Sequence, residues 1–100
     1  MTKVRLEILP SLAGLFDSRG AGRLIFKKEI GEDTTVGDLL KKLAAEYQAF
    51  GEVVFLPGTH ELSGYVNIIL NERLLHFPEE LGTILNEGNT ILILPVVEGG

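Results

Sequence analysis

Cysteine is absent from the 100-residue sequence, and its absence excludes several kinds of chemistry. There is no disulfide framework, no thiolate nucleophile and no cysteine-based zinc or iron–sulfur site. Such a composition fits a reducing compartment, and we expect a cytoplasmic protein. The first ten residues place Lys3, Arg5 and Glu7 among apolar residues, so they lack the apolar stretch of a secretory signal.

Long apolar runs and clustered positive charge are also missing. The longest nearly uncharged segments, 65–71 and 90–97, are far shorter than the roughly 20 residues of a transmembrane helix, so we expect no membrane partner. The net charge is −5, and residues 51–100 contain seven glutamates against Arg73 alone. We expect no nucleic-acid partner, because such proteins carry a basic patch. The acidic half either solubilises the protein or steers a basic protein partner.

Residues that could form a catalytic or cofactor site are scarce. No spacing joins His60 or His76 to a nucleophile and a carboxylate, and neither has a second histidine at helical spacing for a zinc site. Glu79 and Glu80 are adjacent, which is typical of a solvated acidic turn. The glycines of segment 20–22 precede no helix and no Lys-Ser/Thr pair, so they do not indicate a phosphate loop. We therefore expect no enzymatic activity, no metal and no bound cofactor.

Hydrophobic periodicity predicts a small α+β domain. Alternation predicts strands at 4–8 and 24–30, separated by a loop at 11–22 whose apolar residues pack onto the core or face a partner. An apolar stripe predicts one long helix that ends at Gly51, with Thr35 and Asp38 as its capping pair. The stripe comprises Val36, Leu39, Leu40, Leu43, Ala44, Tyr47 and Phe50.

The second half of the chain completes the sheet. Residues 51–64 are expected to be irregular, and 65–70 and 73–77 are expected to be strands joined by a tight turn at Asn71-Glu72. A short helical turn is predicted near 81–85. Residues 90–94 are apolar on both faces, which predicts a central strand. The predicted core comprises Val4, Leu6, Phe26, Leu39, Leu43, Tyr47, Ile68 and Ile93.

The sequence ends in two glycines, Gly99 and Gly100, after Pro95 has closed the last predicted strand. Five residues then extend up to about 17 Å beyond the strand. Glycines lack a Cβ, so they fit a narrow channel and leave the final carboxylate unhindered. A carboxylate is ionised at neutral pH and can attack the α-phosphate of ATP. We expect 96–100 to be a flexible tail, because terminal residues stay mobile unless they are docked.

The order of elements and the Gly-Gly end resemble the ubiquitin-like β-grasp sulfur carriers of the MoaD/ThiS family. Three segments carry the resemblance: V-N-I-I-L-N at 66–71, L-N-E-G-N-T at 85–90, and I-L-P-V-V-E-G-G at 93–100. The resemblance implies a single β-grasp domain over 1–100, with a mixed sheet of four to five strands and one main helix packed across it.

The resemblance also implies a function. A ubiquitin-activating-type adenylyltransferase would use ATP to adenylate Gly100, which would become a thiocarboxylate, while Val96, Val97, Glu98 and Gly99 would enter the partner's active site. A larger sulfur-acceptor subunit or synthase would then use the sulfur for molybdopterin or tungstopterin cofactor, cysteine, thiamine or thio-tRNA. The long segments 11–22 and 51–64 resemble the cysteine-synthesis carriers. A ubiquitin-like protein modifier or a β-grasp interaction domain without sulfur chemistry is the alternative.

Overall fold

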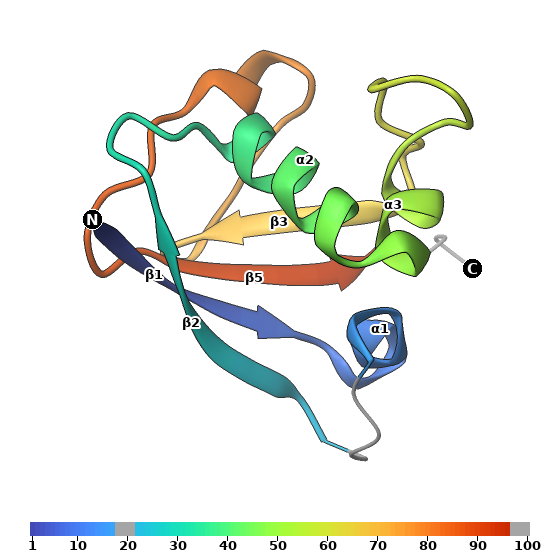
Figure 1. Cartoon of the computed structure of the whole chain (residues 1–100), viewed down its shortest axis with the longest axis horizontal. Coiled ribbons are helices and arrows are strands. Elements are labelled where there is room, and N and C mark those ends of the chain that lie inside the picture. The colour runs from blue at the N-terminus through green and yellow to red at the C-terminus, as the bar shows by residue number, and fades with distance from the viewer. Residues whose placement is uncertain (18–21, 97–100) are drawn as a thin grey trace.

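The computed structural model describes residues 1–17 and 22–96. These residues form one five-stranded sheet with helices on one of its faces (Figure 1). The strands are β1 (Thr2–Ile8), β2 (Leu24–Ile30), β3 (Val66–Leu70), β4 (Arg73–Leu74) and β5 (Thr90–Pro95). The helices are α1 (Pro10–Ala13), α2 (Val36–Glu46) and α3 (Gln48–Val54), with 3₁₀ turns η1 (Gly14–Phe16) and η2 (Glu79–Gly82).

The sheet is mixed, and the strand order is β2-β1-β5-β3-β4. Strand β5 lies in the centre, parallel to β1 and antiparallel to β3. The predicted central position of 90–94 is therefore confirmed. The predicted turn between β3 and β4 is also confirmed: Asn71 and Glu72 have φ values of 46° and 72°, so two residues reverse the chain.

Alternation along each strand builds the core. The side chains that face the helices are buried: Val4, Leu6 and Ile8 of β1, Val66, Ile68 and Leu70 of β3, and Ile91 and Ile93 of β5. Six of the eight predicted core residues are buried: Val4, Leu6, Leu39, Leu43, Ile68 and Ile93. Phe26 and Tyr47 are only partly buried, although they pack against the core. Phe26 lies on the edge strand β2 and Tyr47 at the end of α2, so neither is enclosed on all sides.

The start of α2 is fixed as the sequence predicts. The Asp38 N–H donates to Thr35 Oγ1 and the Thr35 N–H donates to Asp38 Oδ2, both at 3.1 Å. These hydrogen bonds satisfy amides that the first helical turn leaves without partners. They stabilise the ionised carboxylate, so the pKa of Asp38 is lowered.

The predicted end of the helix at Gly51 is wrong. The chain is extended at Tyr47, and Gly51 lies inside α3. A Cβ on Gly51 would stand 3.1 Å from both the Cβ and the carbonyl oxygen of Ala44. Glycine is therefore needed where α3 approaches α2 closely, and it does not terminate the helix.

Three further segments differ from the predictions. The loop expected at 11–22 contains α1 and η1, and its Leu12 and Phe16 are buried on the core. The strand expected at 73–77 pairs only at 73–74, because the chain turns away before Pro78. The helical turn expected at 81–85 is η2, which begins earlier and ends at Gly82.

Candidate functional site

The end of β5 determines where the C-terminal segment leaves the sheet. The Val96 N–H donates to the Tyr65 carbonyl oxygen at 2.9 Å, and the Leu9 N–H donates to the Ile93 carbonyl oxygen at 3.2 Å. Strand β5 is thus hydrogen-bonded to neighbouring chain segments on both of its sides near its C-terminal end. Val96 is 39% exposed and Tyr65 is 66% exposed. Of the predicted site residues only Val96 is placed; Val97, Glu98, Gly99 and Gly100 lie outside the described residues.

The exit point is at the end of the sheet where α1, α3 and the segment after α3 gather (Figure 1). The opposite end carries the N-terminus and the turns between β3 and β4 and before β5. The exposed side chains nearest to the exit along the chain, Tyr65 and Val96, are apolar or amphipathic. A partner that contacts this end therefore meets apolar surface beside the last described residue.

The sheet face away from the helices bears a continuous row of side chains, which we call the open face. Cross-strand pairing aligns one residue from each strand, in the order Ile25, Glu7, Leu92, Ile69 and Leu74. Ile25 is 47% exposed and Leu74 is 44% exposed, whereas Leu92 and Ile69 are half-buried. Because four of the five are aliphatic, this row is suited to docking against a protein.

A charged cluster interrupts the apolar row at Glu7. The Glu7 carboxylate accepts from Arg5 Nε at 3.1 Å and from Arg23 Nη1 at 2.9 Å. Hydrogen bonds from Arg23 and then Arg5 lower the pKa of Glu7. With two guanidinium groups around one carboxylate, this cluster carries a net positive charge. The acidic character of the second half of the chain therefore does not extend to this part of the surface.

His60 and Glu80 make contacts within the fold, whereas the His76 and Glu79 side chains are exposed. The His60 ring lies edge-on to Phe55, with centroids 5.7 Å apart. Glu80 accepts from the His76 backbone N–H and from Arg73, and these contacts lower its pKa. Within residues 1–17 and 22–96 there is no cluster of three or more metal-ligating side chains, and no helix is long and apolar enough to cross a membrane.

Comparison with known proteins identifies the fold and the family. The sequence model of the ThiS family matches residues 21–100. The chain belongs to the ThiS family. The predicted resemblance to ubiquitin-like β-grasp carriers is therefore confirmed. Because the match extends over residues 97–100 of the sequence, it includes the Gly-Gly end as well as the folded part.

Relatives of this ThiS-family protein include both modifiers and carriers. Small archaeal modifier protein 3 of Haloferax volcanii is 32% identical over 71 residues, which cover 71% of this chain and 75% of that protein. The sulfur carrier protein CysO of Mycobacterium tuberculosis is 33% identical over 67 residues, covering 66% and 72%. Such relatives are small carriers and modifiers, not enzymes themselves.

Solved structures support the same fold. The crystal structure of SAMP1 from Haloferax volcanii superposes with a TM-score of 0.75 at 26% identity, covering 98% of this chain and 99% of that one. A CysO protein of Amycolatopsis orientalis, solved in complex with BexX, has the same fold, with a TM-score of 0.67 at 21% identity over 97% and 99% of the two chains. The predicted α+β fold with a mixed sheet is confirmed.

Sequence reasoning did not identify the open face. The signal was present, because Leu92 alternates with buried Ile91 and Ile93, and Ile69 alternates with Ile68 and Leu70. Which outward residues form one row depends on strand order and register, and these are set by pairings between distant segments.

Proposed function

We propose that this ThiS-family protein is a sulfur carrier that is loaded at Gly100. The proposal is carried by the ThiS-family match over 21–100, which includes the Gly-Gly end. The held end of β5 supports it, because a fixed β5 gives a partner enzyme a defined distance from the sheet to the carboxylate. The name of the CysO relatives supports it as well.

The chemistry proceeds in two steps. A Gly100 carboxylate oxygen attacks the α-phosphorus of ATP and expels pyrophosphate, which leaves an acyl-adenylate. The sulfur of a sulfide donor then attacks the acyl carbon and expels AMP, so that one oxygen is replaced by sulfur. The partner supplies the ATP site, and we place both steps in the cytoplasm. Residues 96–99 reach into the partner's site, which glycine permits because it has no Cβ.

The partners we propose are a ubiquitin-activating-type adenylyltransferase and a larger protein that accepts the sulfur. The open face is the proposed docking surface, with Ile69, Leu74 and Leu92 as its apolar part. The cluster of Arg5, Glu7 and Arg23 would orient the partner. Because its long segments resemble the cysteine-synthesis carriers and CysO is a relative, we propose cysteine synthesis ahead of molybdopterin synthesis as the pathway.

The test measures intact-protein mass after incubation with the activating enzyme, ATP and sulfide. The native chain is expected to gain the mass difference between one sulfur and one oxygen atom. Adding one Ala after Gly100 moves the carboxylate by about 3.3–3.6 Å, and a misplacement on the order of 1 Å can reduce a rate about a hundredfold. Deleting Gly100 should be equally damaging. Unchanged loading of the extended or shortened chain would refute the role of Gly100.

Attachment to lysines is the second candidate function, and the 32% identity to small archaeal modifier protein 3 favours it. The same activated carboxylate would then form an isopeptide bond with a lysine amine and release AMP. Expression of a tagged chain in its own cells separates the two functions. Isopeptide-linked species that depend on Gly100 mark a modifier, whereas a thiocarboxylate without such species marks a dedicated carrier.

A further inference from the structure

A groove of about 820 Å³ lies along the outer edge of β3, away from β5. The segment 56–64 forms one wall and the segment 74–81 forms the other. Its volume lies within the range of about 300–1,000 Å³ that binding sites have. The walls are mainly apolar, and their larger side chains are Leu56, Leu62, Leu74, Leu75, Phe77 and Leu81.

The floor of the groove is an unpaired stretch of strand. The Val96–Tyr65 hydrogen bond and the pairing of Val66 with Pro95 show that the backbone groups of Val66 point away from β5. On the outer side, the last hydrogen bond is from the Leu75 N–H to the Ile68 carbonyl oxygen, at 2.9 Å. The register Ile69↔Leu74 would continue to Phe77 opposite Val66, but the chain has left the sheet there.

As a result, the Val66 N–H and carbonyl oxygen form no hydrogen bond with any residue in 1–17 or 22–96. Val66 is nevertheless only 6% exposed. Backbone groups that are this enclosed normally have a partner, because leaving them unpaired costs free energy. An added strand supplies a donor and an acceptor at the spacing of Val66, as in other proteins that bind peptides by strand addition.

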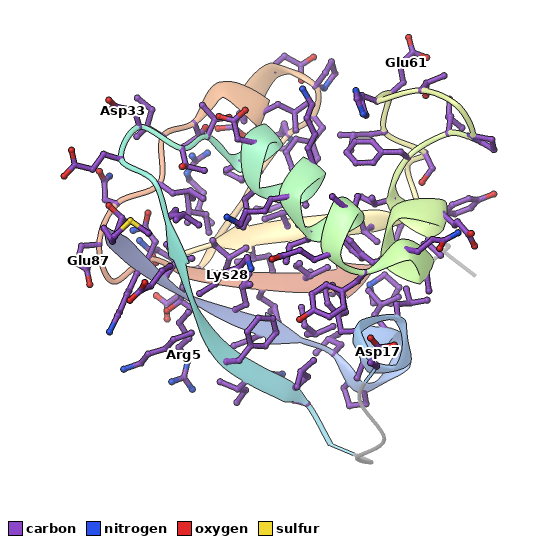
Figure 2. All side chains as sticks on the ribbon, in the orientation of Figure 1. Arg5, Asp17, Lys28, Asp33, Glu61 and Glu87 are labelled. Atoms are coloured by element: carbon purple, nitrogen blue, oxygen red, sulfur yellow. The ribbon has the colours of Figure 1, made fainter. Side chains whose placement is uncertain are left out.

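The charges around the groove specify the kind of strand. Glu61 and Glu79 line it, and both are exposed, whereas no lysine or arginine among the described residues lines it. Figure 2 shows Glu61 on the loop that follows α3. The groove therefore favours a cationic ligand.

We propose that this groove binds an extended peptide segment of a partner protein, with alternating apolar side chains and flanking basic residues, as an additional strand beside β3. The segment pairs with the Val66 backbone and places its apolar side chains between the walls. Glu61 and Glu79 hold the basic flanks. The groove lies at the opposite edge of the sheet from β2 and close to the point where the C-terminal segment leaves β5, since Val66 pairs with Pro95.

The probe is the peptide acetyl-Lys-Val-Thr-Ile-Thr-Lys-amide, titrated into the ¹⁵N-labelled full chain and followed by amide chemical shifts. We expect the largest shifts at Val66, Ile68 and the two walls. A peptide methylated on the one backbone nitrogen that would donate to the Val66 carbonyl oxygen should bind about two- to tenfold more weakly, because one hydrogen bond of about 0.5–1.5 kcal/mol is lost. A peptide with Glu in place of Lys should also bind more weakly.

Two protein variants complete the test. Replacing both Glu61 and Glu79 by Lys should weaken binding of the Lys peptide severalfold and reverse its salt dependence, because added salt would then screen a repulsion instead of an attraction. Glu32→Lys is the matched control, because Glu32 is exposed on the loop after β2 and should leave binding unchanged. Equal binding of the methylated peptide, shifts confined to the open face, or no shifts at all would overturn the proposal. Loading of Gly100 is assayed separately, so failure of one proposal leaves the other standing.

Discussion

Replacing Gly51 by alanine tests whether the close approach of α2 and α3 requires glycine. In an open helix this change stabilises by about 0.5–1 kcal/mol, because alanine has less backbone entropy to lose. Here the new Cβ would lie 3.1 Å from the Ala44 Cβ and carbonyl oxygen and 3.3 Å from its Cα. Backbone atoms of α2 cannot rotate away, so the helices must separate.

The gain in helix stability and the cost of the close contact with Ala44 oppose each other, and we expect the cost of the contact to be larger. Forcing an extra methyl group into a packed site costs about 1–3 kcal/mol. Subtracting the helix gain leaves a net loss of about 0–2.5 kcal/mol, centred near 1 kcal/mol, for Gly51→Ala. A loss of 1 kcal/mol corresponds to about 4–8 °C in Tm for a domain of this size. Urea denaturation followed by circular dichroism measures the change.

Gly14 provides the matched control. It has helical backbone angles, φ −62° and ψ −22°, and a Cβ there would meet nothing within 4 Å. Gly14→Ala should therefore stabilise by about 0.4–1 kcal/mol. Ala44→Gly in the Gly51→Ala background should recover part of the loss, since it removes one of the two clashing methyl groups. If Gly51→Ala is as stabilising as Gly14→Ala, the helix contact does not require glycine and our account of position 51 is wrong.

Three further predictions concern the packing of the core, the stability of the protein at low pH, and the effect of salt on its association with a partner. Leu43→Ala should lower the free energy of unfolding by about 2–5 kcal/mol, because Leu43 is fully buried; a loss below 1 kcal/mol in urea denaturation would contradict the packing. The fold lowers the pKa values of Glu7, Asp38 and Glu80. Their ionised carboxylates therefore add to the free energy of unfolding above their usual pKa, and this contribution is lost as the pH falls below about 4. Denaturation between pH 7 and pH 3 checks this, and Glu80→Gln should flatten the acid decline where Glu32→Gln does not. The association rate with the activating enzyme should fall with added salt, because exposed charges are screened beyond about 8–10 Å at physiological ionic strength; a rate that salt does not change would leave the apolar row as the docking determinant.

Local patterns in the sequence predicted the elements that depend on neighbouring residues. Alternation located the strands, and the Thr35–Asp38 spacing located the start of α2. The break at Tyr47 could not be predicted this way, because the apolar stripe continues through Phe50. Glycine follows a helix end and also occurs at a close helix contact, and only the position of Ala44 in space distinguishes the two.

The candidate site likewise has one part that the sequence predicts and another that only the structure reveals. The Gly-Gly end is visible in the sequence because its chemistry needs no neighbour, and its role at Gly100 stays a prediction. The open face and the groove each combine strands that are far apart in the sequence. They could therefore be recognised only once the structure gave the order and register of these strands. The short pairing of β4 illustrates this: an apolar run at 73–77 predicted a strand, yet the turn before Pro78 ends the pairing, so that within residues 1–17 and 22–96 nothing hydrogen-bonds to Val66 on the outer side of β3.

The central place of β5 also constrains when the protein can fold. Without β5, β1 pairs only with β2, and β3 pairs only with β4, so the chain consists of two hairpins with no strand in common. The strand that joins them is the last one to leave the ribosome, and its contacts with β1 span most of the chain, which slows folding. A polypeptide interrupted before Thr90 therefore cannot assemble the open face. Translation therefore has to pass Thr90 before the row from Ile25 to Leu74 can exist as one continuous surface.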